Sequence, residues 1–400
     1  MYTPPRAILD AYADVLINFA LNSGKGLKPG EVVLVRVPES AKPFYVPLRN
    51  TIIRAGGHPL MQFLAEDVEM KDIYELSSDA QLDFFPTAYF KGMVDAIDHA
   101  VSVISTDNKY ELKGLPAHKI MLRAKAAQPF MKWREEKEAA GQFTWTLGLY
   151  GTKAMADDVQ MSQEAYWQEI IVACYLDDPN PVQKWRELAS ELERLRGELN
   201  ALPIDKIRVV GEGIDLAVGL GKNRQWLGGS GRNIPSFELF ISPDWRRTEG
   251  EITFNQPLYQ YGNRISGVRL IFRKGLIVEA TATENESLLK EMIAVSNANK
   301  IGEFSLTDGR LSRITKVMGE TLYDENMGGP LGNTHLAVGN AYKESFPGEL
   351  ATVTPEEWAS MGYNESAVHT DIISTTDRIV TATLEDGSQK VIYAHGQFTL

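Results

Sequence analysis

The feature of the sequence that most constrains the fold is a long helical pattern near its middle, because different patterns lie on its two sides. Residues 180–203 start with Asn180 as N-cap and Pro181 in the first helical turn. The apolar residues of this pattern recur on one face: Trp185, Leu188, Leu192, Leu195 and Leu199. The alternating charges elsewhere favour a solvent-exposed face over one that binds a partner. We therefore predict two domains, residues 1–203 and residues 204–400.

The first domain has a pattern of alternating helices and strands. Apolar residues at helical spacing predict helices over residues 8–21, 47–56 and 161–176. Short apolar runs predict strands over residues 32–37, 58–64, 100–106 and 143–151. Strands that alternate with helices form largely parallel sheets. We expect an α/β domain with a largely parallel sheet.

The second domain has a different pattern, with short segments separated by glycine. The runs over residues 252–259, 266–275 and 276–283 alternate between apolar and polar residues, as antiparallel strands do. We interpret the glycines from Gly211 to Gly231 as turns between strands. The pattern predicts an α+β domain rich in hairpins.

Composition excludes several classes of protein. Lys and Arg total 41 against 53 Asp and Glu, and the formal net charge of −12 disfavours a nucleic-acid surface. No run approaches the roughly 18 apolar residues of a membrane span, and the first residues lack the pattern of a signal peptide. The single cysteine, Cys174, excludes an internal disulfide and a thiolate metal cage, and its apolar neighbours predict burial. We expect a cytoplasmic protein that binds neither nucleic acid nor membrane.

Short motifs exclude some chemistries. The zinc-protease motif HExxH and the nucleophile elbow GxSxG are both missing from the sequence. The glycine-rich stretch contains neither GxGxxG nor GxxxxGK[ST]. With one cysteine and six histidines, the chemistry must come from carboxylates, imidazoles and hydroxyls.

Carboxylates and histidines gather in the second domain. His369 and Asp371 are two residues apart, which points both side chains to one face if the segment is a strand. Glu238 and Glu303 have apolar or glycine neighbours, and a buried glutamate is costly unless it is paired or metal-bound. Each residue alone also has an ordinary explanation: a histidine can be structural, and Glu238 can face solvent.

A glycine-rich segment brings Glu325, His335 and Tyr342 into one region. His335 lies ten residues after Glu325, and Tyr342 lies seven residues after His335, which is two turns if the segment is helical rather than a strand. Tyr342 by itself is typical of a core or surface aromatic residue. Four carboxylates and two imidazoles together would suit a two-metal site, in which carboxylates neutralise the cations and imidazoles fix their geometry. Spacing alone leaves that interpretation open.

These segments resemble the metallo-aminopeptidases typified by thermophilic aminopeptidase T and aminopeptidase S. NIPSFELFISP is similar to the family's Asn-x-Pro-x-x-Glu-x-Phe-x-x-Pro element, and IGEFSL is similar to its Leu-Gly-Glu element. LYDEN, NTHLAVGNAY and NESAVHTDII are similar to further elements in the same order, and LKPGEVVLVRVP resembles the family's opening strand. The family commonly has two adjacent glutamates where this chain has Phe237 and Glu238. The resemblance implies six metal ligands: Glu238, Glu303, Glu325, His335, His369 and Asp371.

The resemblance also implies a fold, an assembly and an activity. It implies an N-terminal α/β domain, an α+β catalytic domain, a homodimer, and hydrolysis of N-terminal residues from peptides with a free N-terminus. The cofactors would be two divalent metal ions, either zinc, cobalt or manganese. Glu303 would accept the proton of the attacking water, and Tyr342 would donate to the developing oxyanion. Two alternatives stay open: a dinuclear hydrolase that acts on another amide, and a metal-binding protein without turnover.

Overall fold

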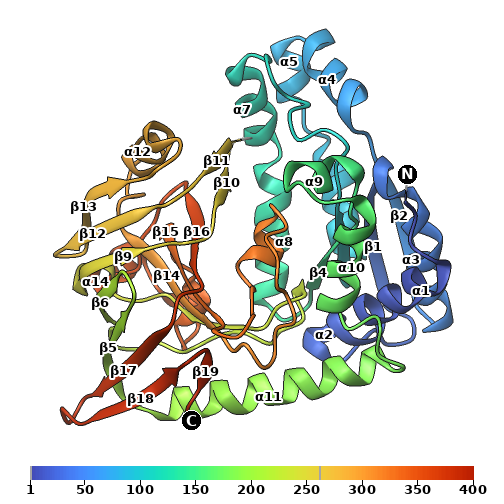
Figure 1. The fold of residues 1–400 in the computed structure, drawn as a ribbon. Coiled ribbons are helices and arrows are strands. Elements are labelled where there is room, and N and C mark those ends of the chain that lie inside the picture. Colours follow the sequence, from blue (N-terminus) through green and yellow to red (C-terminus); the bar gives the residue numbers. More distant parts are fainter. Residues whose placement is uncertain (1, 261–262) are drawn as a thin grey trace. The chain divides into compact units, whose positions relative to one another are not determined.

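Residues 2–260 and 263–400 are described by the structure, which is a computed structural model (Figure 1). Contacts between residues divide the chain into two units. The first unit comprises Met1–Arg186 and Ser230–Ile234, and the second comprises Glu187–Gly229 and Pro235–Leu400. The predicted domain boundary between residues 203 and 204 stays a prediction.

The first unit is built on a five-stranded sheet with the order β2-β1-β3-β4-β7, in which every neighbouring pair is parallel. Its strands are β1 Val32–Pro38, β2 His58–Leu64, β3 His99–Ile104, β4 Thr144–Leu149 and β7 Asn233–Ile234. Val33, Val35 and Val101 are completely buried, as expected for central strands that are covered on both faces. The predicted α/β fold with a largely parallel sheet is confirmed.

Helices connect the strands of this sheet. They are α1 Arg6–Val15, the π-helical turn η1 Leu16–Ala20, α2 Leu21–Gly24, the 3₁₀ turn η2 Glu39–Ala41, α3 Lys42–Arg54, α4 Asp67–Leu76, α5 Asp79–Asp83, α6 Thr87–Ala96, α7 Ala117–Ala126, α8 Gln128–Ala139, α9 Lys153–Asp158 and α10 Gln163–Ala173. The helix predicted over residues 8–21 forms as α1 and continues into η1. It ends at Asn22 and Ser23, which both have a positive φ of 54°. Cys174 directly follows α10 and is buried, as predicted.

The long central helix, α11, spans Pro181–Ala201. Asn180 Oδ1 accepts a hydrogen bond from Gln183 N at 3.2 Å, which satisfies one of the unpaired amides at the start of the helix. The five apolar residues predicted to share one face are all buried. The N-cap and the apolar face are therefore confirmed.

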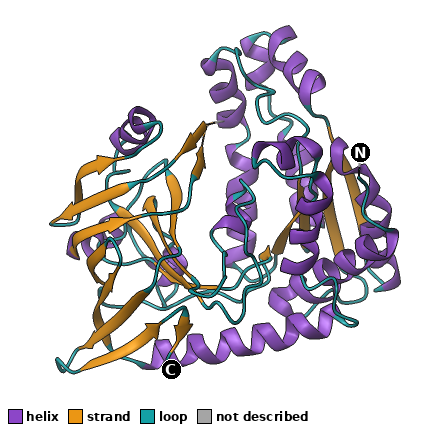
Figure 2. Cartoon of the chain, in the orientation of Figure 1, coloured by secondary structure: helices purple, strands orange, loops and turns teal. Residues whose placement is uncertain are grey.

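Most strands of the second unit belong to two antiparallel sheets, and β10 and β11 pair separately (Figure 2). The larger sheet has the order β13-β12-β9-β6-β5-β17-β18-β19, and the smaller has the order β16-β15-β14-β8. The larger sheet consists of β5 Ile204–Gly211, β6 Ile214–Gly219, β9 Thr248–Thr253, β12 Arg269–Arg273, β13 Leu276–Thr281, β17 Arg378–Leu384, β18 Gln389–Ala394 and β19 Gln397–Phe398. The smaller sheet consists of β8 Glu238–Ile241, β14 Ile301–Thr307, β15 Asn333–Gly339 and β16 His369–Ser374.

Short elements complete this unit. They are the hairpin β10 Leu258–Gln260 and β11 Asn263–Ile265, the helices α12 Glu286–Ala294, α13 Thr321–Asp324 and α14 Pro355–Met361, and the 3₁₀ turns η3 Trp245–Arg247, η4 Lys343–Ser345 and η5 Leu350–Thr352. The predicted α+β fold rich in hairpins is confirmed. Among the residues that the structure describes, no helix has the length and apolar character needed to cross a bilayer.

Candidate metal centre

The two faces of the four-stranded sheet differ in character. One face contributes Leu239, Phe304, Leu336 and Ile372 to the apolar core of the second unit. The other face is defined by the pairs Thr307 with Glu238, Ser305 with His335, Glu303 and Asp371 with Ala337, and His369 with Gly339. Directly paired residues of antiparallel strands point the same way. The register therefore brings five predicted ligands to one face: Glu238, Glu303, His335, His369 and Asp371.

A β-bulge separates Glu303, which lies on this face, from Ile301, which lies in the core. Ile301 and Glu303 pair with adjacent residues of β15, so Gly302 is the extra residue of the bulge. Residues two apart in a regular strand face the same side, but the bulge lets Ile301 enter the core while Glu303 points the other way. A Cβ at Gly302 would lie 2.1 Å from the carbonyl oxygen of Asn340. The bulge therefore requires glycine at this position.

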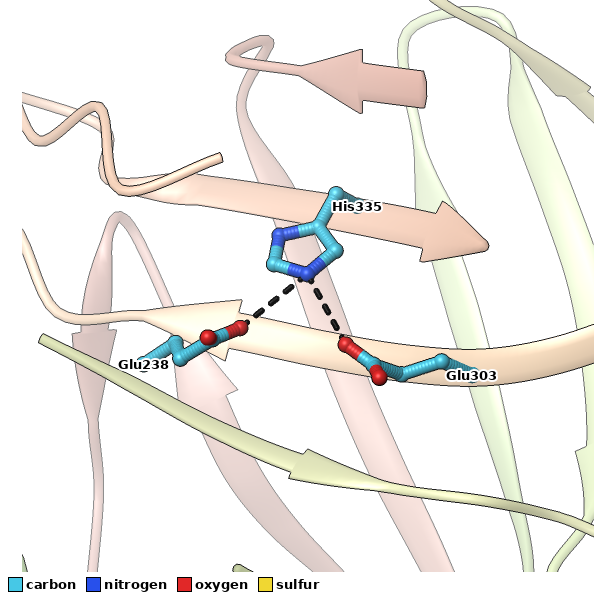
Figure 3. A group of neighbouring side chains, drawn as sticks. All are labelled: Glu238, Glu303 and His335. Atoms are coloured by element: carbon cyan, nitrogen blue, oxygen red, sulfur yellow. Dashed lines mark hydrogen bonds and ion pairs between the residues drawn. The ribbon is translucent and has the colours of Figure 1, made fainter. Parts of the chain in front are cut away.

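His335 lies between two glutamates (Figure 3). Its Nε2 is 3.1 Å from Glu238 Oε2 and 3.1 Å from Glu303 Oε1. One potential ligand atom from each of the three buried side chains lies within 4.8 Å of the other two. Ser305 Oγ donates to Glu238 Oε2 at 2.8 Å, which restrains that carboxylate. This group brings carboxylate oxygens and an imidazole nitrogen close enough to bind one cation.

His369 and Asp371 adjoin that group. His369 Nε2 is 3.9 Å from Glu303 Oε2 and 3.7 Å from Asp371 Oδ1. Asp371 Oδ1 is also 3.8 Å from His335 Nε2. The two oxygens of Glu303 thus face different imidazoles, and Asp371 lies near both. Asp371 Oδ1 is buried without a hydrogen-bond donor among the described residues, so it is an unsatisfied acceptor within the cluster.

Backbone carbonyls fix the orientation of both imidazole rings. His335 Nδ1 donates to the carbonyl of Glu325 at 3.1 Å, and His369 Nδ1 donates to the carbonyl of Asn340 at 2.9 Å. Because a carbonyl only accepts, each Nδ1 carries a proton and each Nε2 faces the carboxylates. The Nε2 lone pair of a neutral ring is then directed into the cluster, as in most metal-binding histidines.

Glu238, Glu303, His335, His369 and Asp371 form a cluster in which the negative charge of the carboxylates exceeds what the two imidazoles and the hydrogen-bond donors can balance. Burial, together with Glu238 and Asp371, raises the pKa of Glu303 to about 7. Burial alone would lower the pKa of His335, but its hydrogen bonds to Glu238 and Glu303 outweigh burial and raise it. Buried carboxylates in such excess must bind protons or cations. With its unsatisfied Asp371 oxygen, the donor set fits a divalent metal ion.

Glu325 approaches the cluster from the end of a helix. It directly follows α13 and is buried. Burial, followed by repulsion from Glu238 and Asp371, raises the pKa of its carboxyl well above the ordinary value. The neighbouring Asp324 accepts a hydrogen bond from Met318 N at 2.6 Å, which holds the short helix in place. Glu325 therefore lies close enough to interact electrostatically with Glu238 and Asp371, although it lies outside the group of three around His335.

Tyr342 lies in a loop that follows strand β15, so the helical alternative for this segment is wrong. Its ring packs edge-on against His369 at a centroid distance of 4.8 Å and against Phe240 at 5.7 Å. Tyr342 is 40% exposed, yet partial desolvation, together with Glu303 and Asp371, raises the pKa of its hydroxyl. The hydroxyl thus stays protonated at neutral pH and can donate a hydrogen bond.

Sequence reasoning missed three contributors to this centre. Ser305 and Phe240 lie two residues after predicted ligands on the same strands, so the alternation of side chains could have identified them. Asn340 contributes through its backbone carbonyl, which any residue type could provide. No sequence signal could have revealed that contact.

Comparisons with known proteins agree with the resemblance seen in the sequence. The profile of the family described as "Thermophilic metalloprotease (M29)" matches residues 6–398. Aminopeptidase T from Thermus aquaticus is 27% identical over 418 residues, which cover 98% of this chain and 100% of the relative. Aminopeptidase PepS from Streptococcus thermophilus is 25% identical over 415 residues, which cover 98% of each chain.

A solved structure is also similar. Wild-type AmpT from Thermus thermophilus matches with a TM-score of 0.83 and 26% sequence identity, over 98% of this chain and 99% of that one. The resemblance to the aminopeptidase T and aminopeptidase S family is therefore confirmed. The chain belongs to the thermophilic metalloprotease (M29) family, whose description implies a divalent metal ion and the hydrolysis of peptide bonds.

Proposed function

We propose that the chain is an aminopeptidase whose cluster binds two divalent metal ions. The observation that carries the proposal is the position of Glu303 and Asp371, whose carboxylates each lie near both His335 and His369. Carboxylates that each lie near two imidazoles would suit a pair of divalent ions. The residues proposed to hold the ions are Glu238, Glu303, Glu325, His335, His369 and Asp371.

The charge of these residues supports two ions rather than one. With both imidazoles neutral, the four carboxylates carry four negative charges, which two divalent ions balance. A single divalent ion would leave two buried negative charges that need protons or other cations. Zinc, cobalt and manganese all accept carboxylate and imidazole ligands, so the donor set supports each of them.

The proposed chemistry divides between the metal ions and two residues of the chain. Bound ions would supply the positive charge that polarises the scissile carbonyl and activates water. Glu303 accepts the proton of the attacking water and delivers it to the leaving amine. Tyr342 donates its hydroxyl proton in a hydrogen bond to the developing oxyanion, from its position beside His369.

The proposed substrates are peptides with a free N-terminus. A buried cluster of carboxylates favours the cationic α-amine of such a peptide. The relatives named above are aminopeptidases, which supports the same substrate class. We further propose a homodimer, on the basis of the family resemblance, and a cytoplasmic location, since a single buried cysteine suits a reducing compartment.

Matched peptides test this function. The metal-loaded protein is expected to release N-terminal residues from an unblocked peptide and to leave its N-acetylated counterpart intact. Comparable hydrolysis of both would favour the dinuclear hydrolase that acts on another amide. Retention of two ions without turnover of either peptide would favour a metal-binding protein that is not an enzyme.

A further inference from the structure

Asn326, which follows Glu325, has a completely buried side chain with a partner for each polar atom. Its Oδ1 accepts a hydrogen bond from Phe237 N at 2.6 Å. Its Nδ2 donates to the carbonyl of Leu322 at 3.2 Å and to Glu325 Oε1 at 3.4 Å. Because a backbone N–H only donates, the oxygen of the amide must face Phe237. The Nδ2 amino group must therefore face the two acceptors, so the orientation of the side-chain amide is determined.

These contacts link several proposed ligands. Phe237 directly precedes Glu238, the first residue of β8, so the bond to its amide fixes the start of that strand. The bond to Glu325 Oε1 restrains the rotation of the Glu325 carboxylate. The carbonyl of Glu325 in turn accepts from His335 Nδ1. The dipeptide Glu325–Asn326 thus carries one of the six proposed ligands and contacts the segments that carry two others.

We propose that Asn326 is a positioning residue for the metal centre, and the inference rests on the proposed function of that centre. It holds the Glu325 carboxylate and the start of β8 in place before a metal ion binds. Groups that orient metal ligands through hydrogen bonds typically affect metal affinity by about 10–100-fold when they are replaced. The predicted role of Asn326 therefore lies in metal affinity rather than in the chemical step.

Ser312, which lies before α13 in the connection between β14 and β15, provides a matched control. Ser312 is buried, and its Oγ donates to the backbone carbonyl of Asn326. Ser312→Ala removes a buried hydrogen bond to Asn326 but no contact with a proposed ligand. A loss that comes only from weaker packing of the loop should therefore appear equally in Ser312→Ala and in Asn326→Ala.

The experiment measures zinc affinity by competition with a chelator, with amide hydrogen exchange of the metal-free protein as a second readout. Asn326→Ala is expected to weaken zinc binding about 10–100-fold and to increase exchange at the amide of Phe237. Ser312→Ala is expected to keep the zinc affinity of the wild type even where its melting temperature falls. Equal losses of zinc affinity in the two variants would overturn the proposal.

Asn326→Asp keeps the proposal testable if the alanine variant does not fold. The aspartate still offers an acceptor to Phe237 N, but its other oxygen meets the Leu322 carbonyl and the Glu325 carboxylate, which are both acceptors. Slow exchange at Phe237 together with weaker zinc binding is the expected result, and wild-type zinc affinity would overturn the proposal. A separate variant distinguishes failure of this proposal from failure of the proposed function. If the cluster does not bind metal, Glu238→Gln would bind zinc as tightly as the wild type.

Discussion

Two buried histidines, one from each unit, contact glutamate in opposite surroundings. His99, at the start of β3, contacts Thr144 Oγ1 through Nδ1 at 2.8 Å and Glu31 Oε2 through Nε2 at 3.0 Å. The same Glu31 oxygen accepts from Lys28 N at 2.7 Å and from Asn22 Nδ2 at 2.9 Å. In the first unit, a single carboxylate is thus surrounded by donors.

The metal centre has the reverse balance. There, one nitrogen of His335 faces the carboxylates of Glu238, Glu303 and Asp371. Burial acts to raise the pKa of Glu31, but hydrogen bonds from Lys28 N, His99 and Asn22 together lower it, whereas the pKa of Glu303 is raised to about 7. A buried contact between histidine and glutamate therefore indicates a cation site only where acceptors outnumber donors.

Removal of the metal ions should have the largest effect among the tests of this difference between the surroundings of His99 and His335. If the excess carboxylates require cations, a chelator should abolish peptidase activity while most secondary structure, measured by circular dichroism, remains. Elemental analysis of the metal-loaded wild type should give two ions per chain. A preparation that is fully active with one ion or none would contradict the inference that the carboxylates around His335, unlike Glu31 beside His99, require two cations.

Glu303→Gln should have the next largest effect. The amide cannot take a proton from water, so turnover should fall roughly 100-fold or more, with a smaller change in KM. Steady-state kinetics and metal content, measured on the same samples, separate loss of the base from loss of metal. Near-normal turnover with metal retained would assign the base to another carboxylate, with Glu238 or Glu325 next in line.

Tyr342→Phe tests the role of the Tyr342 hydroxyl, and its effect should be smaller again. The ring can still pack on His369 and Phe240, so metal content and melting temperature should stay near those of the wild type. Loss of the oxyanion donor should cost roughly 2–4 kcal/mol of transition-state stabilisation, measured as kcat. A purely structural tyrosine would give the opposite pattern, with full activity in Tyr342→Phe and loss of stability only in Tyr342→Ala.

Glu31→Gln should have the smallest effect, and only on stability. We expect unchanged metal content and turnover, with a loss of about 1 kcal/mol in the free energy of unfolding by urea, since the carboxylate is partly exposed. Because the folded-state pKa of Glu31 lies below its ordinary value of 4.5, the stability from its charge is present above pH 4.5. The difference between variant and wild type should shrink as the pH falls below that value. Loss of metal in this variant would contradict a purely structural role for the His99 contacts.

Local patterns predicted much of the fold, because they depend on neighbouring residues. The N-cap Asn180 and the apolar face of α11 follow from helical spacing, and the shared face of His369 and Asp371 follows from the alternation along a strand. The opposite directions of Ile301 and Glu303 do not follow from alternation, because the bulge at Gly302 lies between them. The need for glycine at this bulge arises from the carbonyl of Asn340, which is distant in the sequence.

The sequence by itself determined which strands and helices form and which carboxylates and imidazoles the chain can offer as ligands, because propensity, alternation and motif order are local properties. Only the tertiary structure decided which of these residues meet. Glu238 and Ser305 are 67 residues apart in the chain, yet their side chains share a hydrogen bond. The balance of donors and acceptors that separates His335 from His99 arises from such long-range contacts, because burial and electrostatic interaction depend on distance in space.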